Sequence, residues 1–413
     1  MTVLRYAGLA LAPLAMFAGA LAQAAPVKIG LLETLSGSQA TTGQAYRAGV
    51  RYAVDKMNAA GGWNGQAVQL AEYDNQGGPA GASDKLKAAI ADGVQIIVQG
   101  ASSAIGGQIT EDVRKYNLRN PGREIVYINL GAEALELTGD KCHFHHFRLT
   151  TNAQMRVKVL VQGMKQAGVL GTKVYAINQN YSWGQDMEQA IVDNAAAGGY
   201  QVVGKTLHDV NKIQDFAPYV AKIGASQAQT IITGNWSNDL LLLMKAAKDS
   251  GLKSHFGTVF LDQPGNITNA GDLAVGNYIA HTFNAEAVGE PGAKFVADFT
   301  AKMGHAPVFI EPQAVFGMEM VADALARTRP VAGKLDVNAL VRAVETAHIK
   351  TPMGEVSMRA ADHQMLLPLV VSTVSKDARY KADGTKLGFK PVRLFTAAEA
   401  AVPAQASCKM RRL

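Results

Sequence analysis

Apolar residues recur along this chain in two alternating patterns, one typical of strands and one typical of helices. Segment 27–37, VKIGLLETLSG, is a short apolar run that ends in turn residues, which predicts a buried strand. Segment 41–62 has apolar residues at helical spacing and ends in two glycines. Thr41 and Gln44 have the spacing of a capping box at its start. Together the segments predict a strand followed by a helix.

This strand-then-helix unit repeats in two successive series. The first series has strands expected at 27–37, 66–74, 94–100 and 123–131. The second has strands expected at 172–180, 200–210, 229–235 and 256–263. Strands that alternate with helices of roughly 10 to 15 residues predict parallel sheets covered on both faces. The sequence therefore predicts an α/β fold with two similar doubly wound parallel-sheet lobes, and no low-complexity linker separates them.

The order of elements changes in the last third of the chain. Helices are expected at 291–304, 312–328 and 336–348, followed by a hairpin-like end at 354–375. Because the connections must be short, we expect the tail to return to the earlier lobes.

The N-terminus has the features of a secretory signal peptide. Arg5 precedes an apolar run at 9–21, and the small-residue pattern Ala-Gln-Ala at 22–24 predicts cleavage before Ala25. A membrane anchor is the alternative, but Pro13 and Gly19 interrupt the run, which falls short of the roughly 20 apolar residues of a span. No cysteine follows the cleavage site for lipid attachment. We expect an exported protein in a periplasm.

The charge balance argues against a nucleic-acid partner. The chain has 40 Lys and Arg residues against 34 Asp and Glu residues, a formal charge of +6, and these charges are interspersed. After residue 24, roughly 390 residues remain, which is enough for two or three domains. We expect a monomer with a mildly basic, solvated surface.

The two cysteines, Cys142 and Cys408, are expected to form a disulfide in an oxidising compartment. The chain-entropy model gives the bridge an upper estimate of roughly 5 kcal/mol. A metal site is the alternative, because His143, His145 and His146 follow Cys142 closely. Alternation on a strand would separate these side chains onto two faces, so we expect no metal.

Polar and aromatic residues gather where the expected strands end. Ligands of open parallel sheets bind at this edge. The first lobe offers hydroxyls and backbone N–H groups at helix starts, which suit a carboxylate. The second lobe offers Tyr181, Trp183, Trp236 and the acid Asp262, which suit a small-molecule pocket. The segments concerned are 34–38, 100–103, 129–133, 178–183, 234–236 and 262–263.

Each of these residues also has a purely structural interpretation. Ser102 and Ser103 could cap the following helix, Trp183 and Trp236 could belong to the core, and Asp262 could be a turn residue. The binding interpretation is favoured because all of them fall at the same structural edge.

The sequence lacks the motifs of common catalytic sites. It contains no G-x-S-x-G elbow, no phosphate-binding G-x-x-x-x-G-K-S/T loop and no H-E-x-x-H. His208, His281 and His363 are isolated, which is typical of surface or hydrogen-bonded histidines. We expect a protein that binds a small molecule and has no cofactor and no catalytic residue.

Together, the residues resemble the periplasmic binding proteins for branched-chain amino acids, which serve ABC transporters. The resemblance covers nearly the whole chain after residue 24 and rests on EYDNQ, QGASSAIGGQ, INLGAEALELT, NQNYSWGQD and TPMGEVSMRAADHQ, together with segment 27–65. It implies the type I periplasmic-binding-protein fold, a Venus flytrap with two lobes joined by three hinge crossovers, and a transient partner in a membrane permease.

On this chain the resemblance places the crossovers near Arg148, Tyr278 and Gly354. The implied domains are lobe 1 at 25–148 plus 279–353, lobe 2 at 149–278 plus 354–400, and a disulfide-tied tail at 401–413. The implied ligand residues form one set: Ser102, Ser103 and the loop Gly131, Ala132 and Glu133 bind the carboxylate, Trp183 covers the ligand, and Asp262 binds its ammonium.

The chain departs from the family pattern at Glu133. Relatives often have a threonine hydroxyl near the carboxylate at this position, and an acid there would repel the ligand. Either Glu133 points away, or the ligand is not a plain amino acid. The position of the ammonium-binding acid is also open, because segment 260–266 aligns in more than one register. Aromatic acids and amides therefore stay open as ligands, as does a role as a flytrap sensor.

Overall fold

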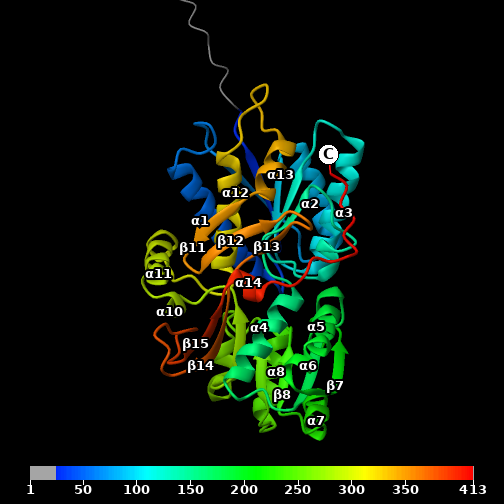
Figure 1. Cartoon of the computed structure of the whole chain (residues 1–413), viewed down its shortest axis with the longest axis vertical. Helices are drawn as coiled ribbons and strands as arrows, with labels where there is room; N and C mark the ends of the chain where they lie inside the picture. The colour runs from blue at the N-terminus through cyan, green and yellow to red at the C-terminus, as the bar shows by residue number, and fades with distance from the viewer. Residues whose placement is uncertain (1–24, 413) are drawn as a thin grey trace, which may run out of the picture.

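The computed structural model describes residues 25–412 and consists of two α/β lobes stacked along the long axis of the molecule (Figure 1). The expected signal peptide lies outside the described residues. Each lobe has a mostly parallel sheet with helices on both faces, so the prediction of two α/β lobes is confirmed. Within the described range, no helix combines the length and apolar character needed to cross a bilayer.

The first lobe contains an eight-stranded sheet. Strands β1 to β5 are parallel, and a hairpin from late in the chain extends the sheet beside β5. In spatial order the strands are β11 (His348–Thr351), β12 (Gly354–Arg359), β13 (Gln364–Leu366), β5 (His146–Arg148), β4 (Val126–Asn129), β3 (Ile96–Gln99), β1 (Lys28–Glu33) and β2 (Gln69–Asp74).

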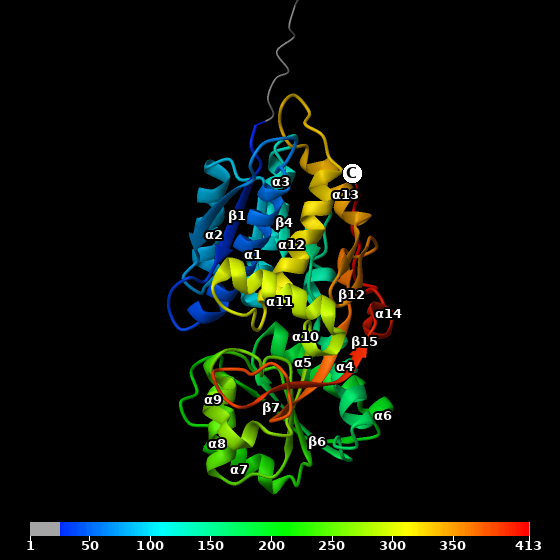
Figure 2. The same ribbon diagram turned by 90° about the vertical axis from the view of Figure 1, so that its left-hand side faces the viewer.

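Helices cover both faces of this sheet, and strand β1, which pairs with β2 and β3, shows why. Leu31 and Leu32 are both fully buried, and because neighbouring side chains on a strand point to opposite faces, they enter two different hydrophobic clusters. Figure 2 shows α1, α11 and α12 together on one face. The helices are α1 (Ala40–Ala59), α2 (Pro79–Ala91), α3 (Ser103–Arg119), α11 (Glu290–Met303), α12 (Glu311–Ala326) and α13 (Val337–Glu345), with the 3-10 helix η1 (Leu135–Thr138).

The second lobe contains a seven-stranded sheet in which β14 is antiparallel to both of its neighbours. Its strands, in spatial order, are β15 (Gly388–Phe395), β14 (Leu369–Ser375), β10 (Tyr278–His281), β9 (His255–Thr258), β8 (Thr230–Thr233), β6 (Lys173–Gln179) and β7 (Gln201–His208). Its helices are α4 (Ala153–Gln166), α5 (Ser182–Asp193), α6 (Ala195–Gly198), α7 (Ala217–Ala225), α8 (Asn238–Asp249), α9 (Asn266–Ala270) and the 3-10 helix η2 (Gly271–Ala274). The short helix α10 (Ala285–Val288) follows β10, and α14 (Ala397–Ala400) follows β15.

Three chain connections join the sheets, and the third differs from the expected boundary. The first follows Arg148 and the second follows His281. Strands β12 and β13 belong to the first sheet because Gln364 pairs with Arg148, so the chain crosses between Leu366 and Leu369 and not near Gly354. Segment 354–366 is therefore part of lobe 1.

The C-terminal tail runs from the second lobe back to the first (Figure 1). Cys142 and Cys408 form a disulfide across a separation of 266 residues, which confirms the expected pairing. Lys158 of α4 donates to the carbonyl of Ala401 at 2.8 Å, so the tail also contacts the second lobe. Among residues 25–412, no group of three or more metal-ligating side chains gathers in one place.

Two local expectations were wrong. Helix α1 begins at Ala40, and Thr41 and Gln44 form no capping box, because the Gln44 amide donates to the carbonyl of Leu35 at 3.3 Å. The histidines beside Cys142 were expected to alternate along a strand. Only His146 lies on a strand, because β5 starts at that residue.

Candidate functional site

A cavity lies between the two lobes, at the carboxyl ends of the strands. Its space free of protein atoms is about 380 Å³, part of it open to solvent. The first lobe contributes Thr42, Tyr46, Gly100, Ala101, Ser102, Ser103, Gly131, Glu133, Phe309 and Ile310, and the second contributes Tyr181, Trp183, Trp236 and Phe260. Beside it, Ser237 donates from its hydroxyl to the carbonyl of Ser38 at 3.5 Å, so the lobes are in contact.

The end of β3 and the start of α3 form one wall of the cavity. Ser102 precedes the helix with φ of 72°, and its side chain makes no capping hydrogen bond. Ser103 is the first helical residue, and its hydroxyl accepts from the backbone N–H of Ala134 at 3.1 Å. The start of a helix carries backbone N–H groups without intrahelical partners and the positive end of the helix dipole. This wall therefore suits a ligand carboxylate.

Glu33 lies directly beneath this wall. It is fully buried, and Oε1 accepts from the backbone N–H groups of Gly100 and Ala101, the latter at 3.2 Å. Burial raises the pKa of Glu33 to about 8, although bonds from Ala101, Gly100 and Thr34 oppose the shift. The carboxyl is therefore mostly neutral at pH 7 and does not repel an anion above it.

Two glycines allow Tyr46 of α1 to reach the cavity. A Cβ atom on Gly131 would lie 1.6 Å from the Tyr46 hydroxyl, and one on Gly100 would lie 2.4 Å from its ring. Asn129 shapes the loop that carries Gly131, because its Oδ1 accepts from the N–H groups of Gly131 and Ala132 at 3.0 and 2.7 Å. Any side chain at these two glycine positions would displace the tyrosine.

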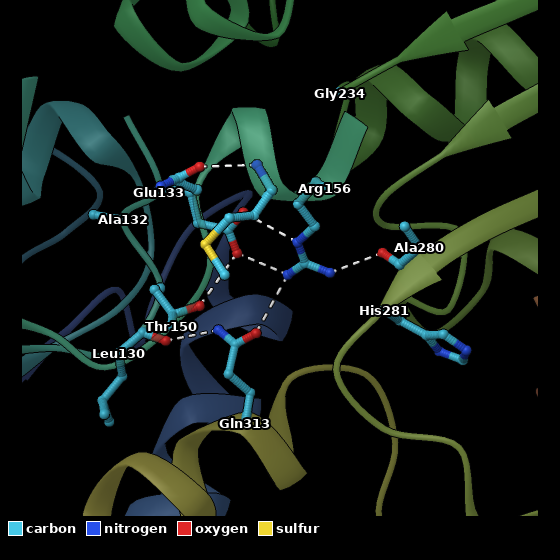
Figure 3. Close-up of polar contacts among 12 residues, drawn as sticks. Leu130, Ala132, Glu133, Thr150, Arg156, Gly234, Ala280, His281 and Gln313 are labelled. Atoms are coloured by element: carbon cyan, nitrogen blue, oxygen red, sulfur yellow. Dashed lines mark hydrogen bonds and ion pairs between the residues drawn. The ribbon is translucent and has the colours of Figure 1, made fainter. Parts of the chain in front are cut away.

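Glu133 and Arg156 form a buried ion pair between the lobes, as Figure 3 shows. Their side chains are 2% and 3% exposed, and the guanidinium makes two bonds to the carboxylate, from Nη2 to Oε1 at 2.7 Å and from Nε to Oε2 at 3.1 Å. Burial lowers the pKa of Arg156, but Glu133 more than offsets this, so that pKa lies above its ordinary value. The carboxylate thus has a partner that compensates its burial.

Aromatic side chains of the second lobe form the opposite wall. Trp183, near the start of α5, donates from its indole N–H to the carbonyl of Gly234 at 2.8 Å. The indole N–H of Trp236 donates to the Tyr181 hydroxyl at 2.8 Å. The Trp183 and Phe260 rings lie 5.6 Å apart, centroid to centroid. These contacts fix the rings as a rigid apolar surface with satisfied polar atoms.

Most of the residues expected from the sequence gather at this cavity. Seven of the nine line it: Ser102, Ser103, Gly131, Glu133, Tyr181, Trp183 and Trp236. Ala132 is buried behind the wall, where a Cβ on Gly106 would lie 2.7 Å from its own Cβ. Asp262 is outside the lining residues and pairs with His281, with 3.3 Å between Oδ2 and Nδ1.

Five further side chains line the cavity that the pattern of strand ends did not predict: Thr42, Tyr46, Phe260, Phe309 and Ile310. Thr42 and Tyr46 are one helical turn apart, but nothing in segment 41–62 distinguishes them from core positions. The glycines Gly100 and Gly131 were the one sequence signal for Tyr46, because a glycine in or beside a strand often marks the close approach of another group.

The three histidines described as isolated are all buried and hydrogen-bonded. His208 pairs with Asn235 at 3.1 Å, His281 with Ser372 at 2.8 Å and His363 with Glu345 at 2.7 Å.

Comparisons with known proteins agree with this architecture. The family model described as "Periplasmic binding protein" matches residues 26–379. Leu/Ile/Val-binding protein homolog 4 of Brucella abortus is 59% identical over 406 residues, which are 98% of each chain.

Solved structures show the same arrangement of lobes. The leucine-, isoleucine-, valine-, threonine- and alanine-binding protein of Brucella ovis, in a closed conformation, has 59% identity and a TM-score of 0.91, covering 94% of this chain and 100% of that one. An ABC-transporter solute-binding protein of Rhodopseudomonas palustris, in complex with 3,4-dihydroxybenzoic acid, shares the fold, with a TM-score of 0.76, 19% identity and coverage of 90% and 98%. The match to the family model and the extent of these similarities establish that the chain belongs to the periplasmic binding protein family.

Proposed function

We propose that this protein is the periplasmic solute-binding component of an ABC importer and delivers a small amino acid to a membrane permease. The observation that carries this function is the cavity, to which both lobes contribute side chains. One wall offers the start of α3, which suits a carboxylate, and the other offers packed aromatic rings, which suit an apolar side chain. The protein acts as a monomer and needs no cofactor.

The mechanism is a population shift between open and closed lobes. A ligand in the cavity contacts both lobes only when they are closed, so its binding energy favours the closed form. The permease then recognises that form. The three connections and their short length restrict the motion to a hinge between the sheets.

Small aliphatic amino acids are the ligand class that the site favours. The wall at the start of α3 suits the carboxylate of such a molecule, and the aromatic wall suits its apolar side chain. The Brucella ovis relative carries leucine, isoleucine, valine, threonine and alanine in its name, at 59% identity. Aromatic carboxylates are the competing class, because Trp183, Trp236 and Phe260 could stack on a benzoate ring.

A thermal-shift panel followed by calorimetry tests this function. A ligand that binds only the folded form raises the melting temperature, so leucine, isoleucine, valine, threonine and alanine are compared with benzoate and 3,4-dihydroxybenzoate. Scattering with and without ligand measures contraction, and ATP hydrolysis by a reconstituted permease measures delivery. We expect aliphatic amino acids to bind and to contract the protein. A protein that binds none of the panel contradicts the proposal, and binding of the benzoates alone reassigns the ligand class.

A further inference from the structure

The cavity has one ionisable acid in its wall. Among the described residues that line it, Glu133 is the single carboxylate, and none is a lysine, arginine or histidine. The remaining walls consist of hydroxyls, backbone groups, aromatic rings and Ile310. A ligand with a positive charge therefore has one anionic group to contact.

The Glu133 carboxylate retains an unused acceptor position. Its Oε1 accepts from the Thr150 hydroxyl at 3.2 Å and from Nη2 of Arg156 at 2.7 Å, and its Oε2 accepts from Nε of Arg156 at 3.1 Å. An ionised carboxylate accepts about four hydrogen bonds. One position on Oε2 therefore remains available.

Arg156 is fixed by groups outside the cavity. Nη1 donates to the carbonyl of Ala280 at 2.8 Å, and Nη2 also donates to Oε1 of Gln313 at 3.3 Å. The Gln313 amide in turn donates to the carbonyl of Leu130 at 2.7 Å (Figure 3). Arg156 does not line the cavity, so it orients Glu133 without facing the ligand.

We propose that Glu133 binds the ammonium group of an amino-acid ligand and that Arg156, from the second lobe, is the positioning residue that orients its carboxylate. This proposal rests on the proposed function and names the residue that recognises the positive charge of the ligand. It also resolves the conflict expected for an acid beside a ligand carboxylate, because Glu133 serves the other end of the zwitterion.

Asp262 is the competing acid. It lies outside the cavity lining and pairs with His281, and its Oδ1 is buried with no hydrogen-bond partner among residues 25–412. Asp262→Asn is therefore the matched control for Glu133→Gln, because each change replaces one carboxylate near Arg156 with an amide of the same size.

The proposal predicts strong selection of the zwitterion. 4-Methylpentanoate is leucine without its amino group, so it leaves Glu133 without a partner in a desolvated site. Sites built to hydrogen-bond a polar group reject analogues that lack it strongly. We expect the wild-type protein to bind leucine at least about 100-fold more tightly than 4-methylpentanoate, and alanine similarly more tightly than propanoate.

Calorimetry on variants measures this ratio directly. We expect Glu133→Gln to lower the leucine-to-4-methylpentanoate ratio at least about tenfold, while Asp262→Asn leaves it within about threefold of the wild type. Arg156→Lys keeps the charge but loses the two-bond geometry, so leucine affinity falls and 4-methylpentanoate affinity does not. A merely structural role of Arg156 would weaken both ligands equally.

Folding and function have separate readouts. Glu133→Gln leaves the buried Arg156 without its partner and could prevent folding. The double variant Glu133→Gln/Arg156→Met removes both buried charges and is measured in parallel. If the single variant does not fold, the ligand ratio of the double variant tests the proposal. An unchanged ratio in the folded variant, or a wild-type protein that binds both molecules alike, overturns the assignment. A wild-type protein that binds neither these probes nor any amino acid of the panel overturns the proposed function instead.

Discussion

The backbone N–H of Leu135 donates to Oδ2 of Asp186 at 2.6 Å, and this bond joins the two lobes. Leu135 begins η1 in the first lobe, two positions after Glu133, and Asp186 lies on α5, which also carries Trp183. The two segments that meet here therefore also carry cavity residues from opposite walls. Burial raises the pKa of Asp186 to about 6, although the bond from Leu135 opposes the shift.

Asp186→Ala is expected to weaken ligand binding by about 3- to 30-fold, because one hydrogen bond between the closed lobes is lost and the Leu135 N–H is left without its acceptor. Calorimetry with leucine measures the affinity, and scattering of the ligand-free protein should show a larger radius. Asp186→Asn keeps an acceptor oxygen and is expected to remain within about threefold of the wild type.

Glu188→Ala is the control on the same helix, because it removes an ion pair to Lys205 that lies wholly within the second lobe. Equal affinities for Asp186→Ala and Glu188→Ala would mean that the Leu135 bond does not contribute to closure.

Glu33 is expected to make the folded protein less stable as the pH rises from about 4.5 to about 8. Its carboxyl is protonated in the folded state up to about pH 8, whereas it ionises near its ordinary pKa of 4.5 when unfolded. The unfolded chain therefore binds fewer protons in this window, and the free energy of unfolding falls by up to about 1.4 kcal/mol per pH unit. Glu33→Gln removes this slope, as urea denaturation from pH 5 to pH 9 can measure.

The matched control for Glu33 is Glu72→Gln. Glu72 is a partly buried carboxyl whose pKa lies below its ordinary value; burial raises that pKa, but the bonds from Arg47 and Arg51 outweigh this effect. This variant should keep the wild-type slope between pH 5 and pH 8. A Glu33→Gln protein with an unchanged slope would show that Glu33 is ionised in the folded state.

Local sequence patterns predicted those site residues that come soon after the end of a strand. Ser103 follows β3 and Trp183 follows β6, so the rule for strand ends placed both correctly. Tyr46 and Phe309 come from a helix and from a loop before α12, and only the packing of α1 and α12 on the sheet brings them to the cavity. Asp262 follows β9 at the same distance in sequence, but its carboxyl pairs with His281 and does not line the cavity, so the rule for strand ends was wrong there.

The third crossover shows a second limit of sequence reasoning. The hairpin-like pattern at 354–375 was recognisable, and β12 does pair with β13. Which sheet a hairpin joins depends on its edge partner, here the pairing of Gln364 with Arg148, and neither strand encodes that choice in its own periodicity.

Removal of the disulfide is expected to lower stability but not ligand affinity. The tail links the lobes through Lys158 to Ala401 and through the Cys142–Cys408 bridge, and none of residues 311–412 lines the cavity. A double variant, Cys142→Ser/Cys408→Ser, should lose about 2 to 5 kcal/mol of unfolding free energy. Denaturation with and without a reducing agent measures this, and the agent should affect only the wild type. A large loss of affinity in the variant would mean that the tail controls closure.

Trp183→Ala is expected to weaken ligand binding at least about tenfold, or about 1.4 kcal/mol, because the indole forms part of the cavity wall. Trp63 provides a matched control: both tryptophans are 2% exposed, and the indole N–H of Trp63 donates to the Thr328 hydroxyl at 2.9 Å, away from the cavity. Trp63→Ala should lower the melting temperature and leave the affinity of the folded protein unchanged. If both variants lose stability and neither loses affinity, Trp183 serves in packing alone, and the ligand must be held by the remaining wall of Trp236, Tyr181 and Phe260.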